Sequence, residues 1–224
     1  MRALLVLFVS VGCERAREPP PPPPPKPPPV EAVDIVLAID LSKSMEETDL
    51  PSDRLDATQV ALRTFVANSP HDRFGIVLYA QQAKRLAPLT ADRASIERAL
   101  GKIQIGDVPD LGTAIGDGLG LAVDELATST AKRRVVVLVG DGDNNWVTRF
   151  DPDQAAAAAK QAGVIVYTLL VGNDSTTDVG GMSTNPTTFK NIAATTSGAY
   201  YRATDPTTFA RGLAAVRTKL DAGP

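Results

Sequence analysis

The chain has very few of the residues on which common catalytic and metal sites depend. Its 224 residues include one cysteine, Cys13, and one histidine, His71. A single cysteine excludes a disulfide within this sequence, a cluster of thiolate ligands and, given its place near the amino terminus, a thiolate nucleophile in the folded part. His71 stands in a Ser-Pro-His-Asp sequence that is typical of a solvated turn. Neither cysteine catalysis nor a Ser-His-Asp triad is therefore expected.

The sequence also has no excess of positive charge. Its 23 Lys and Arg residues oppose 26 Asp and Glu residues, which gives a formal net charge of -3. Such a chain produces no positive field that would attract nucleic acid. Hydrophobic residues make up 43% and charged residues 22%, as in ordinary soluble domains. We expect no nucleic-acid partner, no small-molecule substrate and no enzyme activity.

No hydrophobic run is long enough for a membrane span. The longest, residues 3–11, is far shorter than the about 20 residues that a spanning helix needs. It follows Arg2 and precedes small residues, as in a secretory signal. The sequence Ser10-Val-Gly-Cys13 resembles a bacterial lipoprotein processing site, which implies a lipid on Cys13. We expect an exported protein of the bacterial cell envelope that is held at the membrane by this lipid.

Proline is concentrated in one segment. All residues from 19 to 29 are proline except Lys26. Proline has no backbone donor for a helix or a sheet, so this segment is expected to form a stiff polyproline II spacer. Three parts follow from this pattern: a signal or lipoprotein-like segment at residues 1–13, a proline-rich linker at 14–32, and a folded domain at 33–221.

Apolar runs and helical stretches alternate from residue 33 onward. Continuous apolar runs predict buried strands at 34–39, 74–79, 134–139 and 164–171, and weaker patterns predict edge strands at 84–89 and 199–202. Helices are expected between them at 54–67, 91–102, 113–127, 152–162, 187–196 and 206–220. This alternation predicts an α/β fold: a doubly wound, mostly parallel sheet of about six strands with helices on both faces.

In such a sheet, ligands bind beyond the carboxyl ends of the strands. Asp40, Ser42 and Ser44 follow the first expected strand, and Asp141 follows the fourth in chain order. Thr113 stands at an expected helix start. The fold would bring these three hydroxyls and two carboxylates together. Hard oxygen ligands without nitrogen or sulfur suit Mg²⁺, Mn²⁺ or Ca²⁺.

These five residues carry a family resemblance. The pattern Asp-x-Ser-x-Ser, then Thr, then Asp resembles the metal-ion-dependent adhesion site of von Willebrand factor type A domains, with Gly140 where the family usually has Thr or Ser. Residues 107–116, 138–145 and 201–205 resemble the bacterial aerotolerance-operon (Bat-type) members. The resemblance implies a Rossmann-like fold and a divalent cation, Mg²⁺ above the others. It also implies an open coordination position that takes an Asp or Glu of another envelope protein.

Two other interpretations stay open. The sequence Gly140-Asp-Gly-Asp-Asn-Asn145 also resembles a loop of haloacid-dehalogenase-type phosphatases, in which Asp40 would be the nucleophile. That chemistry needs a second carboxylate two residues later, where this chain has Ser42. In the other interpretation, the metal only stabilises the loops and binds no partner.

Two features near the expected site could contact a partner. Trp146 follows the Asp141 loop and is either an aromatic contact at the metal rim or a packed side chain. Residues 173–186 are rich in Gly, Ser, Thr, Asn and Asp and follow the strand at 164–171. A loop there could select the partner.

Overall fold

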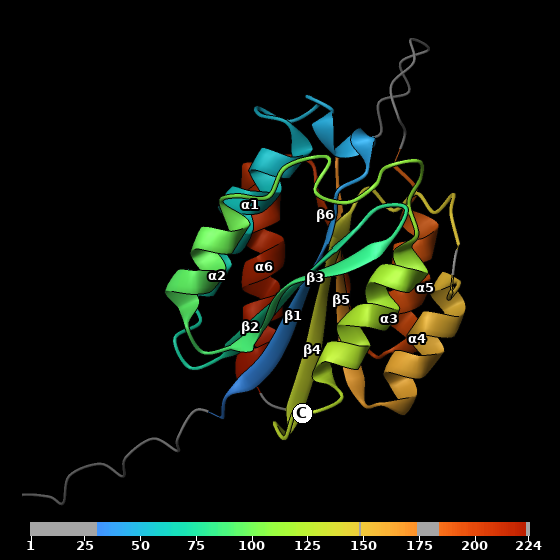
Figure 1. The fold of residues 1–224 in the computed structure, drawn as a ribbon. Coiled ribbons are helices and arrows are strands. Elements are labelled where there is room, and N and C mark those ends of the chain that lie inside the picture. Colours follow the sequence, from blue (N-terminus) through green and yellow to red (C-terminus); the bar gives the residue numbers. More distant parts are fainter. Residues whose placement is uncertain (1–30, 148, 174–183, 223–224) are drawn as a thin grey trace, which may run out of the picture.

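The computed structural model describes residues 31–147, 149–173 and 184–222, which form a central sheet between two layers of helices (Figure 1). The strands are β1 (Val33–Asp40), β2 (Arg73–Tyr79), β3 (Ala83–Thr90), β4 (Arg133–Gly140), β5 (Val164–Val171) and β6 (Tyr200–Ala203). The helices are α1 (Arg54–Ala67), α2 (Arg93–Leu100), α3 (Ile115–Leu126), α4 (Pro152–Gln161), α5 (Pro186–Thr195) and α6 (Pro206–Asp221), with a short 3₁₀ helix, η1 (Lys43–Glu46).

The sheet has six strands in the order β3-β2-β1-β4-β5-β6. All neighbouring strands are parallel except β3, which pairs antiparallel with β2. The predicted fold class is confirmed, and the two strands with the weakest sequence patterns are the two edges. An edge strand needs less continuous hydrophobicity than a central strand, because one of its sides has no neighbour.

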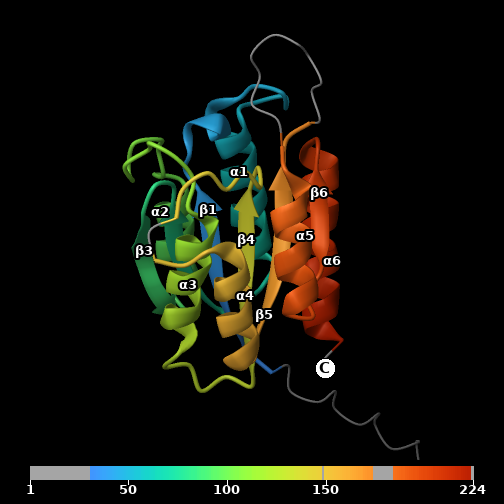
Figure 2. The same ribbon diagram turned by 90° about the vertical axis from the view of Figure 1, so that its right-hand side faces the viewer.

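Each face of the sheet has its own hydrophobic core. In β1, Ile35 and Leu37 point into a core with α1, α2 and α6, whereas Val36 and Ala38 point into a core with α3, α4 and α5. The helices of the second core lie side by side on one face in Figure 2. Burial on both faces explains why the central strands are continuously apolar rather than alternating.

Aspartate side chains cap the amino ends of several helices. Asp53, Asp151 and Asp205 are the N-caps of α1, α4 and α6, and each carboxylate accepts a hydrogen bond from a backbone N–H in the first turn. Such a cap contributes about 1 kcal/mol. The bounds of the helices agree with expectation to within two residues. The sequence pattern did not predict η1, which is too short to have a periodicity.

The strand order places a crevice at one end of the sheet. The chain moves from β1 outward to β2 and β3, then returns to β4 on the other side of β1 and continues to β5 and β6. In sheets of this kind a crevice lies beyond the carboxyl ends of the strands at such a switch point, so we place it between the loops after β1 and β4. Ile39 pairs with Val139 in the register, so Asp40 and Asp141 leave the sheet next to each other.

Several expectations concern residues that the structure does not describe. The signal or lipoprotein-like segment 1–13 with Cys13, most of the linker 14–32 and most of the loop 173–186 lie outside the described residues. Within the described ranges, no helix combines the length and the hydrophobicity that crossing a membrane requires.

Candidate metal centre

The loops after β1 and β4 and the loop before α3 enclose one cavity. Asp40 ends β1, Ser42 and Ser44 follow it, and Asp141 follows β4. Thr113 lies two residues before α3, because this helix begins at Ile115 rather than at Thr113. The cavity has a volume of about 290 Å³ and is lined by Ser42, Lys43, Ser44, Asp110, Leu111, Gly112, Thr113, Asp141, Asp143 and Asn145. Four of the five predicted site residues line it, and Asp40 is joined to them through Ser42.

Hydrogen bonds hold the first loop in a compact turn. The backbone N–H of Ser42 donates to Asp40 Oδ1 at 2.8 Å, and the hydroxyls of Ser42 and Ser44 are 2.9 Å apart. The turn continues into η1, where the N–H of Met45 donates to the carbonyl of Ser42. The two serine hydroxyls are therefore presented side by side, next to an aspartate whose Oδ1 is already bonded.

The other oxygen of Asp40 has no such partner. Asp40 is completely buried, and its Oδ2 is the only buried carboxylate oxygen in the described residues that lacks a hydrogen bond. Burial, and after it the charge of Asp141, raises the pKa of Asp40 well above its ordinary value. Burial also raises the pKa of Asp141, although hydrogen bonds from Ser44 and Asp143 and the charge of Arg54 act against this. Two aspartates close together in a buried place require a compensating charge.

The space beside Asp40 depends on Gly140. A Cβ atom at this position would lie 2.6 Å from Asp40 Oδ2 and 2.7 Å from the hydroxyl of Tyr79. This hydroxyl donates to the carbonyl of Val139 at 3.0 Å. Burial, with the charges of Asp40 and Asp141, raises the pKa of Tyr79 well above its ordinary value, which keeps the phenol protonated. The glycine found in place of Thr or Ser thus leaves room for the carboxylate.

Two asparagines at the end of the 140–145 motif, for which the sequence predicted no role in this centre, position Thr113. The N–H of Thr113 donates to Asn145 Oδ1 at 2.7 Å, and the N–H of Ile115 donates to Asn144 Oδ1 at 3.0 Å. The carbonyl of Thr113 accepts from the N–H groups of Asn145 and Trp146. Asn144 and Asn145 therefore tie the loop before α3 to the loop after β4. The sequence signals for them were the polar run after a strand and the motif resemblances that include them.

The donors of this centre fit a hard divalent cation. A buried carboxylate oxygen without a partner, a second buried carboxylate and three hydroxyls lie in or next to the same cavity. No group of three or more His, Cys, Asp or Glu residues suited to a metal occurs in the described parts of the chain. Hydroxyls would have to supply the remaining ligands, as the Asp-x-Ser-x-Ser pattern predicts.

The remaining predicted residues lie around this centre. Trp146 is 37% exposed, and its side chain packs against Gly112 in the Thr113 loop. The side chain is therefore packed and partly exposed, and its contact with a partner stays a prediction. His71 is exposed in the turn between α1 and β2, as expected. A phosphatase nucleophile must reach its substrate, and the complete burial of Asp40 gives no support to that alternative.

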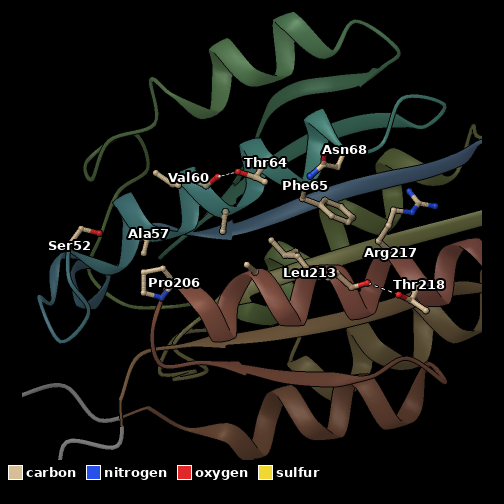
Figure 3. Close-up of a pocket in the computed structure, with 13 residues that line it drawn as sticks. Ser52, Ala57, Val60, Thr64, Phe65, Asn68, Pro206, Leu213, Arg217 and Thr218 are labelled. Atoms are coloured by element: carbon tan, nitrogen blue, oxygen red, sulfur yellow. Dashed lines mark hydrogen bonds between the residues drawn. The ribbon is translucent and has the colours of Figure 1, made fainter.

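A second cavity lies between α1 and α6. It has a volume of about 640 Å³, and the side chains in Figure 3 show that it is mostly apolar, with Val60, Phe65 and Leu213 from the two helices and Arg217 at one end. Its lining contains no carboxylate. This cavity therefore has no ligand set for a metal, and the polar centre at the end of β1 and β4 is the candidate site.

The structure of this chain is similar to those of several solved proteins. BatB from Bacteroides thetaiotaomicron has a TM-score of 0.77, and an aerotolerance-related membrane protein from Bacteroides fragilis has a TM-score of 0.76; each is 22% identical to this chain and covers 86% of it over 100% of its own length. Proximal thread matrix protein 1 from the mussel byssus, with a zinc-occupied MIDAS motif, has a TM-score of 0.67 at 20% identity, covering 84% of this chain and 45% of its own. The structural neighbours thus include Bat-type proteins.

Comparisons of sequence give the same result. An uncharacterised protein from Borreliella burgdorferi is 31% identical over 141 residues, and a UPF0353 protein from Mycolicibacterium gilvum is 32% identical over 151 residues; each match covers 62% of this chain. The matches span 41% and 44% of the length of these two relatives. The profile of the von Willebrand factor type A domain matches residues 34–211. The chain therefore belongs to the von Willebrand factor type A domain family.

Proposed function

We propose that this protein is a noncatalytic binding module that captures a carboxylate of another protein through a divalent cation. Domains of this family are often metal-dependent modules for adhesion or protein interaction. The observation that carries the proposal is the buried Asp40 Oδ2 without a hydrogen-bond partner, beside a second buried aspartate and the hydroxyls of Ser42 and Ser44. A cation would supply the missing partner for that oxygen.

The same residues would hold the cation. Ser42, Ser44 and Thr113 would bind it through their hydroxyls, and Asp40 and Asp141 would bind it directly or through water. Neutral hydroxyls leave much of the charge of a dication uncompensated, so it still attracts a carboxylate from outside. Exposed residues such as Leu111 and Asn145 form part of the cavity lining. A partner would therefore have access to the open coordination position of the cation. Mg²⁺ fits the all-oxygen donor set, and Mn²⁺ and Ca²⁺ suit the same ligands.

The proposed partner is an envelope protein that presents Asp or Glu. Attachment of this chain to the membrane would occur through a lipid on Cys13, with the proline-rich segment as a spacer. Support for an envelope setting comes from a structural neighbour, which is described as a membrane protein. Fatty-acid labelling of bacteria that express the chain tests the anchor: incorporation that Cys13→Ser abolishes supports it, and no incorporation contradicts it.

Two measurements on the full chain test the binding function. Calorimetric titration with Mg²⁺ and Mn²⁺ should give heat with the wild type and none with Asp40→Ala or Thr113→Val. A carboxylate-bearing matrix should then retain the wild type only when Mn²⁺ is present. Thr168→Val is the matched control, because Thr168 is also buried but its hydroxyl donates to the carbonyl of Phe189.

The outcomes separate carboxylate capture from a metal that only stabilises the loops. Metal-dependent retention that Thr113→Val removes and Thr168→Val preserves supports carboxylate capture. Metal binding without retention on the matrix would favour a metal that only stabilises the loops. No metal binding by the wild type would contradict the proposed function altogether.

A further inference from the structure

A buried arginine lies directly beside the candidate metal centre. Arg54, in the first turn of α1, has a side chain that is only 1% exposed. Its Nε and Nη2 donate to the two carboxylate oxygens of Asp49, each at 2.9 Å. Its Nη1 lies 3.4 Å from both Asp141 Oδ2 and the carbonyl oxygen of Ser44. One guanidinium thus contacts a proposed metal-binding carboxylate and the backbone of a proposed metal-binding serine.

The backbone at the end of β5 leaves room for the guanidinium of Arg54. A Cβ atom at Gly172 would lie 2.7 Å from the guanidinium carbon, and Gly172 has a φ of +116°, so the close approach requires a glycine. Asn173, the next residue, donates from its backbone N–H to Asp49 Oδ2 at 2.6 Å and from its side chain to the carbonyl of Asp49 at 2.7 Å. The end of β5 is therefore linked to the metal centre through Asp49 and Arg54.

Asp49 remains charged in this arrangement. Burial alone would raise the pKa of Asp49, but the hydrogen bonds from Arg54 and Asn173 outweigh it and lower the pKa. Asp49 and Asp141 thus share one arginine, and Asp40 lies close enough to Asp141 for their charges to interact. Fully ionised, these four groups have two negative charges in excess, which a single divalent cation would neutralise.

We propose that Arg54 is a built-in counter-charge of the metal centre, which compensates Asp141 when no divalent cation is bound and limits how tightly the centre binds one. This inference rests on the proposed metal-binding function. Asp49 controls the effect, because its two 2.9 Å bonds to the guanidinium are shorter than the 3.4 Å contact with Asp141, so that it competes with Asp141 for the positive charge. Changes at Arg54 and Asp49 should therefore alter cation affinity in opposite directions.

The test is the Kd for Mn²⁺, measured from the electron paramagnetic resonance signal of free Mn²⁺ with the full chain at slightly alkaline pH. Arg54→Met keeps the volume and removes the charge, so it should lower the Kd about tenfold, because a repelling positive charge is lost. Asp49→Asn should raise the Kd several-fold, because the guanidinium then acts on Asp141 alone. In the absence of Mn²⁺, Arg54→Met should also have a lower Tm than the wild type, and Mn²⁺ should reverse most of this loss.

Arg73→Met is the matched control. Arg73 also pairs with a buried aspartate, Asp34, but at the opposite end of β1 and β2. Its loss should lower the Tm equally with and without Mn²⁺ and leave the Kd unchanged. An arginine that only positioned Asp141 would give a different result, since Arg54→Met and Asp49→Asn would then both weaken Mn²⁺ binding.

The possible failures can be told apart. If the wild type binds Mn²⁺ and Arg54→Met binds it equally or more weakly, the counter-charge role is wrong and the proposed function stands. If Arg54→Met does not fold, Asp49→Asn still tests the role, because an unchanged or lower Kd for this variant overturns it. If the wild type binds no Mn²⁺, the proposed function fails and this inference fails with it.

Discussion

The two ends of the central sheet each bury two aspartates, but they compensate them differently. At the amino ends of the strands, Asp34 accepts from Arg73 and Ser129, and Asp72 accepts from Arg217 and the N–H of Val33. At the carboxyl ends, Asp40 and Asp141 are equally buried, yet one oxygen of Asp40 has no partner within the described residues.

This difference separates a structural role from a binding role. A buried carboxylate that the fold itself pairs contributes to stability, and the loss of one partner is costly. A buried carboxylate that the fold leaves partly unpaired lowers stability until something else binds to it. Domains commonly give up stability at functional sites, and the carboxyl end of this sheet fits that behaviour. The two ends should therefore respond in opposite ways to the same substitution.

The largest effects are expected from an aspartate-to-asparagine substitution at each end of the sheet. Asp72→Asn should lower the free energy of unfolding by about 3 kcal/mol, because Arg217, whose side chain is 18% exposed, would lose its buried charged partner and keep only the exposed Asp221. Asp40→Asn should leave the stability of the metal-free protein unchanged or raise it. The same change at Asp40 should weaken Mn²⁺ binding by about 100-fold, since a charged ligand is lost.

Urea unfolding with and without Mn²⁺ measures the effects of both substitutions on stability. The Asp72→Asn loss should be the same in the two conditions, whereas the stabilisation by Mn²⁺ should disappear in Asp40→Asn. If Asp40→Asn destabilises the metal-free protein as much as Asp72→Asn does, the two ends are alike and the comparison is wrong.

The pH dependence of stability should be a smaller effect. The pKa values of Asp40 and Asp141 are raised above their ordinary value of 3.8, so the folded protein binds protons more strongly than the unfolded chain. The stability of the metal-free protein should therefore increase as the pH falls from neutral toward 3.8, by at most about 1.4 kcal/mol per pH unit for each group. Asp49, whose pKa is lowered, loses its stabilising contribution only at lower pH.

Saturating Mn²⁺ should reverse this trend, because cation binding needs ionised carboxylates and competes with protons. Thermal unfolding over a series of pH values, with Mn²⁺ or with a chelator, gives both curves. Asp40→Asn is the control and should flatten the metal-free curve. Parallel curves with and without Mn²⁺ would show that the cation does not bind at these carboxylates.

The sequence predicted the fold well because its signals are local. The apolar runs of the central strands and the helical stretch that begins at Pro152 are features of neighbouring residues, and both were predicted. The candidate site was also predictable, since parallel strands bring their carboxyl ends together whatever the details of packing. Asp40 and Asp141 follow adjacent strands in the structure for this reason.

Arg54 shows what the sequence could not predict. An arginine after the N-cap Asp53 has the appearance of an ordinary surface residue in a first helical turn. Its burial depends on Asp141, 87 residues away, and on the absence of a side chain at Gly172. The roles of Asn144 and Asn145 depend in the same way on the distant loop before α3. Contacts of this kind are set by tertiary packing and have no periodic signal.

The smallest expected effect concerns Trp146, at the rim of the metal end. Its N–H donates to the carbonyl of Thr113 at 3.1 Å, and a Cβ atom at Gly112 would lie 3.1 Å from its side chain. Trp146→Ala keeps the backbone hydrogen bond and removes a side chain that is already 37% exposed. The free energy of unfolding should therefore fall by about 1 kcal/mol or less, and the Kd for Mn²⁺ should stay within about twofold of the wild type.

Binding to a carboxylate-bearing surface should respond more strongly than metal binding does. An aromatic side chain near the open position would contact whatever the cation holds, so Trp146→Ala should weaken Mn²⁺-dependent retention several-fold while Trp146→Phe largely preserves it. Equal retention by wild type and Trp146→Ala would show that the side chain only packs against the protein and does not contact the bound carboxylate. A large loss of Mn²⁺ affinity would instead mean that the ring holds the Thr113 loop in place, because the asparagine hydrogen bonds would then be insufficient for that task.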